Sequence, residues 1–559
     1  MEVKPLPGLL RFWPWLAAIC SGLLCAACFA PFDFTWLCWI ALTPLLAAVW
    51  FSRGEVRHRW LRNLLLGYVA GLTFFWTAFS WLTTVTILGW FVLQFYMAIY
   101  FAVWAWFCGL LQPRERKGER QSTKWDQMLA QARSGAPPSR SPWIKSTNNL
   151  FLALLVAAAW VTQEWFRGWV FSGFGWNGLG VALHDTWPLI QIAEFTGVAG
   201  LSFLVAFANV IAVTTVYRLY LEVSTHTVRP HFDLTLTLAT IVGVLTFGLR
   251  ATQLSSPAKP LRVAAVQSNV PQNQKFDPQF TRKIFDGFRR LSEIALRSTP
   301  PPDLLIWPES AMPGPVLADR ESYQFVMNLA ATAESDILLG TIDEQDGDLY
   351  NAAVLVSDGG EQVQVYRKVH LVPFGEYVPG RYSVPLLARI VGDQVPGDFK
   401  AGKNHTVFEL TNSEVKVAPL ICFEDTIGEL TRRFVLPSEN NAGANLLADI
   451  TNDGWFLRSA GSHQHLANAI FRCVETRRPM VRAANTGVTC FVNQFGRVIQ
   501  KLEDDTGSTF TEGVLTGEVK IPTENQLTFY TRHGELFAKA CAVLTAIAIL
   551  GALAMRRKL

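Results

Sequence analysis

The chain has 559 residues, too many for one ordinary domain, and 50 % of them are hydrophobic while only 17 % are charged. This apolar composition, with 20 Trp and 38 Phe, excludes a disordered or fibrous protein. The net charge of +4 excludes a nucleic-acid binder that relies on bulk neutralisation of phosphates. The composition is typical of a membrane protein.

Eight uncharged stretches approach the ~20 residues that cross the hydrocarbon of a bilayer. Three of them are short and must include flanking residues or tilt. We therefore predict a polytopic domain of about eight transmembrane helices, seven within residues 1–250 and the last within 534–559. The stretches are Phe12–Phe32, Thr35–Ser52, Asn63–Thr83, Thr84–Gln112, Leu150–Gln163, Phe195–Tyr217, Leu234–Leu249 and Ala540–Met555.

Lys and Arg are concentrated in alternate loops, and such loops stay in the cytoplasm. The loops after the second and fourth stretches are basic, and so is the tail Arg556–Lys558. We predict that both termini are cytoplasmic and that the polar segment before the last stretch faces the other side. The basic loop 113–148 is predicted to be a solvated linker, with anionic-lipid binding as the alternative.

Residues 261–520 alternate short β-branched runs with amphipathic stretches, the pattern of an α/β domain. Linkers at 251–260 and 521–533 are expected to connect this domain to the membrane helices. The strands are predicted at Arg262–Gln267, Asp303–Trp307, Ile337–Gly340, Ala353–Val356, Val415–Cys422, Asn445–Ile450, Met480–Ala484, Cys490–Asn493 and Val514–Glu518. The helices are predicted at Pro278–Arg297, Arg320–Glu334 and Ser462–Thr476.

Reactive residues follow three apolar runs of this domain, and strand ends are where α/β sheets hold functional groups. Glu309 follows the run that stops at a Pro, Lys368 and Glu376 flank a Pro-Phe-Gly turn, and Cys422 precedes Glu424 where a helix begins. A thiol at such a turn can become nucleophilic if the helix N-terminus and a nearby cation lower its pKa. Taken singly, each residue is more often a surface or structural residue.

Two further motifs are predicted to carry no chemistry. The stretch Gly173–Gly178 matches G-x-G-x-x-G, but it lies between membrane spans with no preceding strand, so a turn is expected. His463 and His465 suggest a metal site, but no third ligand is recognisable, and helix capping or surface exposure is expected instead.

In their order along the chain, Glu309, Lys368 and Cys422 resemble the Glu-Lys-Cys triad of the nitrilase, or carbon–nitrogen hydrolase, superfamily. Within that superfamily, a catalytic domain inserted before the last of eight spans is similar to the apolipoprotein N-acyltransferase family of bacterial inner-membrane enzymes. The long basic loop is the main departure. Further matching segments are Trp165–Trp176, Ile450–Phe456, His463–His465 and Arg478–Thr489.

The resemblance implies a four-layer αββα sandwich and an acyl transfer that needs no metal or diffusible cofactor. Glu309 would be the general base, Lys368 would stabilise the oxyanion, and Cys422 would carry the acyl group as a thioester. Glu376 and Glu424 would support them. The acyl donor would be a phospholipid, usually the sn-1 chain of phosphatidylethanolamine, and the acceptor the N-terminal amine of a diacylglyceryl-Cys apolipoprotein. A monomer with a periplasmic catalytic domain and no nucleic-acid partner is expected.

The apolar stretch Val384–Val391 is either a lid that enters the membrane or ordinary core. Leu387 and Ile390 on this stretch, together with Trp455 and Phe456, are the candidate substrate-binding residues. Three other functions remain open. They are a membrane-tethered nitrilase-type amidase or hydrolase, an acyltransferase for a different amine or a sugar lipid, and a non-enzymatic lipid-binding scaffold or transporter.

Overall fold

A computed structural model describes residues 12–52, 58–111, 142–225, 230–253, 257–379, 381, 398–411, 413–439 and 443–557. The chain forms two compact units, of which the first comprises residues 1–183, 198–249 and 536–559 and the second 184–197 and 250–535. Residues 184–197 lie between two membrane stretches in the sequence but pack with the second unit. Most of the basic loop and the whole stretch Val384–Val391 fall outside the described residues.

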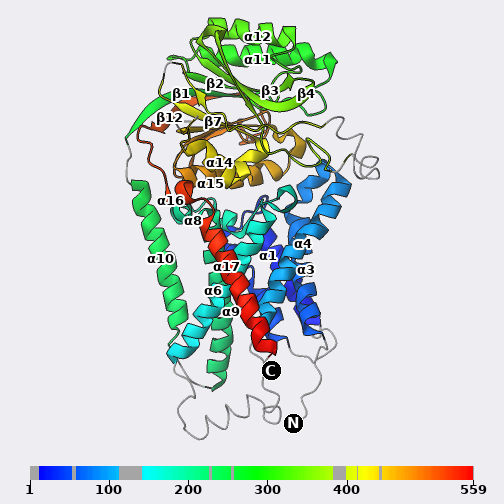
Figure 1. The fold of residues 1–559 in the computed structure, drawn as a ribbon, viewed down its shortest axis with the longest axis vertical. Coiled ribbons are helices and arrows are strands. Elements are labelled where there is room, and N and C mark those ends of the chain that lie inside the picture. Colours follow the sequence, from blue (N-terminus) through cyan, green and yellow to red (C-terminus); the bar gives the residue numbers. More distant parts are fainter. Residues whose placement is uncertain are drawn as a thin grey trace. The chain divides into compact units, whose positions relative to one another are not determined.

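The first unit is a bundle of apolar helices (Figure 1). Among the described residues, five helices contain segments that are long and apolar enough to cross a membrane: α4, α6, α9, α10 and α17. Every stretch predicted to span the membrane overlaps one of the eight main helices, which confirms the predicted helical membrane domain. The bounds are α1 Trp13–Ala27, α2 Thr43–Phe51, α3 Arg59–Ala78, α4 Ile87–Leu110, α6 Pro142–Arg167, α9 Val198–Thr225, α10 Phe232–Gln253 and α17 Leu536–Arg557.

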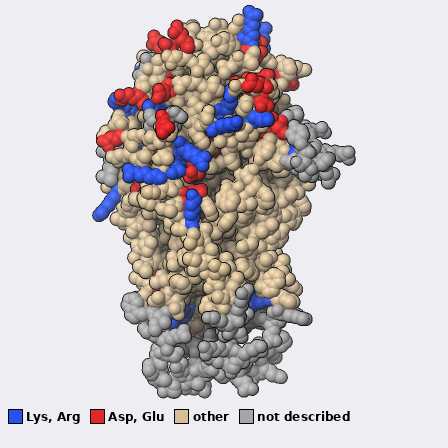
Figure 2. Space-filling model, in the orientation of Figure 1, with Lys and Arg blue, Asp and Glu red and all other residues tan. Residues whose placement is uncertain are grey.

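Charged side chains are scarce on the face of this unit shown in Figure 2, whereas Lys, Arg, Asp and Glu are spread over the second unit. Small residues let the helices approach closely, as is usual in membranes. A Cβ on Gly22 of α1 would lie 2.4 Å from the Ala70 carbonyl oxygen of α3, and one on Gly67 of α3 would lie 2.4 Å from the Phe101 carbonyl oxygen of α4. These three helices therefore pack backbone to backbone.

The second unit contains two six-stranded sheets, ordered β12-β1-β2-β3-β4-β5 and β11-β10-β9-β8-β7-β6. The middle strands of each sheet run parallel, β1 to β3 in one and β7 to β9 in the other, and the remaining pairs are antiparallel. The bounds are β1 Ala258–Gln267, β2 Leu304–Ile306, β3 Asp336–Gln345, β4 Asp348–Ser357, β5 Gln362–Arg367, β6 Phe408–Glu409, β7 Lys416–Ile421, β8 Leu446–Thr451, β9 Met480–Ala484, β10 Cys490–Val492, β11 Val498–Lys501 and β12 Gly513–Pro522.

The two sheets face each other, with β1 near β9 and β4 near β7. Helices α11 (Thr281–Leu296) and α12 (Arg320–Thr332) lie against the first sheet, and α14 (Gly428–Val435) and α15 (Gly461–Thr476) lie along the second (Figure 1). A core of apolar side chains that includes Trp307 fills the space between the first sheet and its helices. The predicted αββα sandwich is therefore confirmed.

Three strands were not predicted, and each of them lies at the edge of a sheet. β5, β6 and β11 are edge strands. An edge strand pairs on one side only and is partly solvated, so its sequence lacks a buried apolar run. β1 pairs with β12 out to Ala258 and Pro522, so strand residues extend into both expected linkers.

Candidate active site

The three triad residues all follow strands of the sandwich. Glu309 comes three residues after β2, Lys368 directly follows β5, and Cys422 directly follows β7. β2 and β5 belong to one sheet and β7 to the other. Glu309 and Lys368 are buried, with 7 % and 1 % of their surface exposed, whereas Cys422 is partly exposed. The fold therefore brings together, at the ends of three strands, residues that are more than fifty positions apart in the sequence.

A buried amide joins the carboxylates of the site. The Asn351 Nδ2 group, on β4, donates to Glu309 Oε1 at 2.7 Å and to Glu376 Oε1 at 2.6 Å. Lys368 Nζ in turn lies 3.0 Å from both carboxylate oxygens of Glu376. Because both N–H groups of Asn351 meet a carboxylate, the orientation of its amide is fixed. Glu309 Oε2 is buried and accepts no hydrogen bond from the described residues.

Lys368 keeps its positive charge in this site although it is buried. Burial disfavours the ammonium, but the surrounding carboxylates, Glu376 first and then Glu309, outweigh that effect and raise the pKa of Lys368 above its ordinary value. The Val372 amide also donates to Glu376 Oε2 at 2.7 Å, which holds the carboxylate against the lysine. A fixed positive charge therefore lies beside the thiol.

Cys422 occupies a sharp turn with a φ of 54°, a left-handed conformation that residues other than glycine rarely adopt. Burial and the Glu309 carboxylate raise the pKa of its thiol well above the ordinary value, and Lys368 and the Thr451 hydroxyl oppose this only partly. The expectation that the turn and a cation lower this pKa is therefore wrong, because desolvation dominates. The resting group is a thiol and needs a base.

Glu424 links the nucleophile turn to the lysine turn. Its Oε2 accepts from the Ile421 amide at 3.0 Å, and its Oε1 accepts from the amides of Val369 at 2.9 Å and His370 at 3.0 Å. The Tyr366 hydroxyl donates to the same Oε1 at 2.8 Å. Burial raises the pKa of Glu424 to about 7, against the opposing effects of Lys368 and these donors. The residue predicted to support Cys422 thus contacts the strand ends on both sides of the site.

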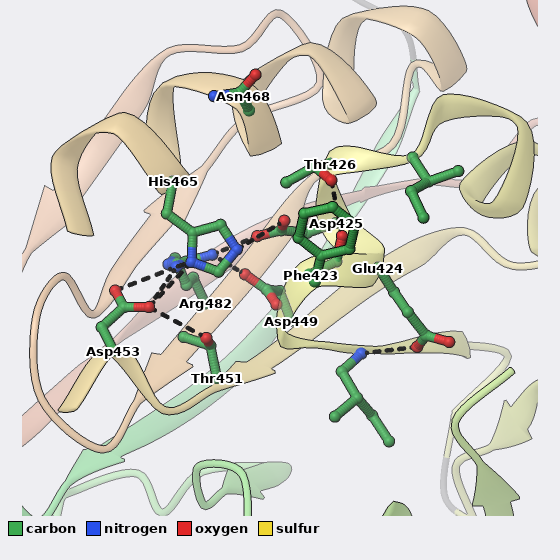
Figure 3. A network of polar contacts seen from close by, with 12 residues as sticks. Phe423, Glu424, Asp425, Thr426, Asp449, Thr451, Asp453, His465, Asn468 and Arg482 are labelled. Atoms are coloured by element: carbon green, nitrogen blue, oxygen red, sulfur yellow. Dashed lines mark hydrogen bonds and ion pairs between the residues drawn. The ribbon is translucent and has the colours of Figure 1, made fainter. Parts of the chain in front are cut away.

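A buried charged network lies beneath the Cys422 turn (Figure 3). The His465 ring is held between Asp425 Oδ1, at 3.0 Å from Nε2, and Asp453 Oδ1, at 2.9 Å from Nδ1. Arg482 lies alongside and contacts Asp425, Asp449 and Asp453. Asp425 belongs to the same short turn as Cys422, Cys422–Thr426, so the network ties this turn to β8, β9 and α15.

His463 is exposed, as predicted, whereas His465 is fully buried and does not cap its helix, so the prediction is wrong for His465. Burial alone would lower its pKa, but Asp425 and Asp453 raise the pKa of His465 to about 9. The two carboxylates favour the protonated ring, whereas Arg482 Nη2, which lies 2.8 Å from Nδ1, opposes it. Among the described residues, no cluster of His, Cys, Asp and Glu is arranged to hold a metal.

The remaining candidate residues lie in different surroundings. Trp455 is 43 % exposed and Phe456 is 9 % exposed, next to each other in the turn Asp453–Phe456 that follows β8. Leu387 and Ile390 fall outside the described residues. Gly173, the first glycine of the G-x-G-x-x-G match, has a φ of 77° in a turn between helices and not at the end of a strand, as expected.

Asn351 was missed in the sequence, although a signal exists. It is a polar residue at the start of the apolar run Ala352–Val356 and is only 5 % exposed. A buried amide in a strand needs partners, and here the partners are the two carboxylates. A thiol, a carboxylate with an unpaired oxygen and a fixed ammonium are groups that can serve as nucleophile, base and electrostatic stabiliser.

Comparison with known proteins identifies the family of this chain. The chain matches the apolipoprotein N-acyltransferase N-terminal domain over residues 21–211 and the carbon–nitrogen hydrolase domain over residues 262–527. The apolipoprotein N-acyltransferase of Geobacter metallireducens is 33 % identical over 97 % of this chain and 96 % of its own. That of Bradyrhizobium diazoefficiens is 29 % identical over 98 % of this chain and 96 % of its own.

Among solved structures, a CN-hydrolase superfamily protein from Xanthomonas campestris has 16 % identity and a TM-score of 0.36, over 47 % of this chain and 91 % of its own. An amidase of the nitrilase superfamily from Nesterenkonia has 18 % identity and a TM-score of 0.34, over 50 % of this chain and 97 % of its own. The sequence matches, which extend over almost the whole length, decide the assignment. The chain belongs to the apolipoprotein N-acyltransferase family, acyltransferase enzymes of the carbon–nitrogen hydrolase superfamily.

Proposed function

We propose that this protein moves an acyl chain from a membrane phospholipid to the N-terminal α-amine of a diacylglyceryl-Cys apolipoprotein, through a thioester on Cys422. The observation that carries the proposal is that Glu309, Lys368 and Cys422, each at the end of a strand, interact with one another. Support comes from relatives named apolipoprotein N-acyltransferase along nearly the whole chain. The proposed donor is phosphatidylethanolamine and the proposed chain is the one at sn-1.

In the first step, Glu309 takes the proton from the Cys422 thiol, and the sulfur attacks the ester carbonyl carbon of the phospholipid. A carbon–sulfur bond forms, and the carbonyl oxygen becomes an oxyanion that the Lys368 ammonium stabilises. Collapse of this intermediate breaks the carbon–oxygen bond of the ester. The departing alkoxide takes the proton from Glu309 and leaves as a lysophospholipid.

In the second step, the neutral α-amine of the apolipoprotein attacks the thioester carbonyl carbon. A carbon–nitrogen bond forms, Glu309 accepts a proton from the amine, and the carbon–sulfur bond breaks. The proton then returns to the sulfur, so Cys422 and Glu309 regain their starting states. Glu376 orients Lys368 in both steps through its contacts of 3.0 Å, and Glu424 holds the nucleophile turn.

We place this protein in the bacterial inner membrane, with both termini in the cytoplasm and the catalytic unit in the periplasm. The basic loops and the basic tail support that orientation. A C-terminal epitope should resist protease added to spheroplasts, and the catalytic unit should be cleaved. Cleavage of the epitope with protection of the catalytic unit would reverse the orientation.

The proposed reaction is tested with the purified enzyme, phosphatidylethanolamine labelled separately in its sn-1 or sn-2 chain, and a diacylated lipopeptide. We expect an N-acylated lipopeptide that carries the sn-1 label, together with an equal amount of lysophospholipid. Cys422→Ser should make no product. Free fatty acid formed at the same rate with and without lipopeptide would instead identify a hydrolase. Labelled product from both chains would disprove the sn-1 assignment alone.

A further inference from the structure

A second buried lysine borders the site and takes no part in the steps above. Lys275 lies in the loop between β1 and α11, and only 3 % of its surface is exposed. Its Nζ donates to the main-chain carbonyl oxygen of Glu309 at 2.7 Å. It also interacts electrostatically with the Glu309 carboxylate and with Cys422. The lysine therefore touches the backbone of the base and faces the nucleophile.

The Lys275 ammonium group has more hydrogen-bond donors than acceptors around it. An ammonium group has three N–H donors, yet only one acceptor within the described residues meets it. Burial lowers the pKa of Lys275 to about 8, although Glu309 and Cys422 counteract that effect. Placing a lysine in such a position costs stability, so packing alone does not explain its presence.

Charge balance distinguishes the two lysines. Lys368 lies 3.0 Å from the Glu376 carboxylate, which neutralises it locally. Glu309 makes no ion pair with the described residues. During acyl transfer a single negative charge passes from Glu309 to the Cys422 sulfur and then to the oxyanion. Lys275 interacts with Glu309 and Cys422, the first two groups that carry this charge, and within the described residues it makes no ion pair of its own.

We propose that Lys275 is a positioning residue of the acyl-transfer site, which anchors the Glu309 main chain and provides the positive charge that balances the ionised Glu309–Cys422 pair. The inference rests on the proposed roles of Glu309 and Cys422. The step that it assists is the transfer of the Cys422 thiol proton to a carboxylate oxygen of Glu309. That step leaves a thiolate and a carboxylic acid, so the positive charge of Lys275 acts on the thiolate.

The test is the pH profile of Cys422 alkylation by iodoacetamide, with the modified peptide quantified by mass spectrometry. This reagent needs neither phospholipid nor lipopeptide, so a wrong substrate assignment leaves the test intact. Cys422→Ala controls for the peptide. Three variants separate charge from hydrogen bonding: Lys275→Arg keeps the charge, Lys275→Gln keeps a donor only, and Lys275→Met keeps neither. Lys259→Met is the control, because Lys259 is an exposed lysine paired with Glu414.

Removing a nearby opposite charge makes a thiolate less accessible by about one pKa unit or more. We expect the Gln and Met variants to react about tenfold more slowly near pH 7, where Lys275 of the wild type is protonated, and to approach the wild-type rate above about pH 8, where Lys275 loses its proton. Lys275→Arg should match the wild type near pH 7, and Lys259→Met should match it at every pH. Lys275 interacts electrostatically with Glu309 and Cys422. Cys422 also interacts with Lys368 and Asp453, and Lys368 in turn interacts with Glu376 and Glu424.

Three results would overturn the inference. The first is a Met profile that superimposes on the wild type. The second is a rate lowered by the same factor at every pH, because that pattern reports a misplaced turn and not a lost charge. The third is loss of the folded protein in both the Gln and Met variants, since it would assign the lysine to structure. A wild-type profile in the Gln variant would show that the hydrogen bond to Glu309 suffices and would overturn the proposed role of the charge.

Discussion

Asn351→Leu tests whether the buried amide orients the proposed base. The substitution is close in volume and removes the donors at 2.7 Å to Glu309 and at 2.6 Å to Glu376. Glu376 keeps Lys368 and the Val372 amide. Glu309 loses the only hydrogen bond to its carboxylate within the described residues, because its other oxygen already has none. The substitution should therefore slow the abstraction of the Cys422 proton by Glu309.

A hydrogen bond to a charged group contributes about 1.5–3 kcal/mol. If that energy is lost from the oriented base, the acylation rate should fall roughly 10- to 150-fold, since 1.36 kcal/mol corresponds to a factor of ten. Removal of the base itself, in Glu309→Gln, should cost more, on the order of 10²- to 10⁴-fold. The expected order of rates is therefore wild type, then Asn351→Leu, then Glu309→Gln.

The rate is measured as the appearance of the acyl adduct on Cys422 by rapid quench and intact mass spectrometry, with phosphatidylethanolamine in excess. Asn328→Leu, an exposed position on α12, is the matched control and should react like the wild type. Melting curves check that each variant is folded. An Asn351→Leu rate equal to wild type, or a rate as low as that of Glu309→Gln, would refute the reasoning.

Three further predictions concern folding and pH. Glu424→Gln places an amide against the four donors that the carboxylate accepts from, and the Ile421 amide loses its partner. The free energy of unfolding should fall by about 1–3 kcal/mol. An unchanged melting temperature would contradict this prediction. Gly67→Leu should abolish recovery of folded protein in detergent, because a Cβ there lies 2.4 Å from a carbonyl oxygen of α4, whereas Gly243→Leu, with nothing within 4 Å, should be recovered normally. The pKa of His465 is raised from 6.5 to about 9, so its contribution to stability is complete below pH 6.5 and is lost as pH rises through 9. The melting temperature of His465→Asn should therefore depend less on pH over this range than that of the wild type. Equal pH dependence of the two proteins would contradict the prediction.

The interior of the fold was predictable from sequence because burial leaves a pattern. The parallel strands at the centre of each sheet are covered on both faces, and β8 is buried along its whole length, so they read as apolar runs. The edge strand β5 alternates polar and apolar residues and gives no such run. Edge strands are defined by their neighbour in space, which a single sequence does not contain.

The triad could be identified from its resemblance to a known family, while its surroundings depend on packing. Asn351 and Lys275 carry no motif, and their proposed roles follow from contacts with Glu309 that only the folded sheet creates. The raised pKa of Cys422 likewise arises from desolvation, which outweighs the local turn and the nearby cation. His465 was predicted to be exposed because its partners Asp425 and Asp453 are 40 and 12 positions away in the sequence.

The most direct test of the account is intact mass spectrometry of the purified protein after incubation with phosphatidylethanolamine, followed by addition of a diacylated lipopeptide. The account predicts an adduct of one acyl chain that is absent from Cys422→Ala and that moves to the lipopeptide amine. An adduct that decays to free fatty acid whether or not lipopeptide is added would contradict the proposed acceptor. The absence of any adduct on the folded wild-type protein would contradict the thioester mechanism.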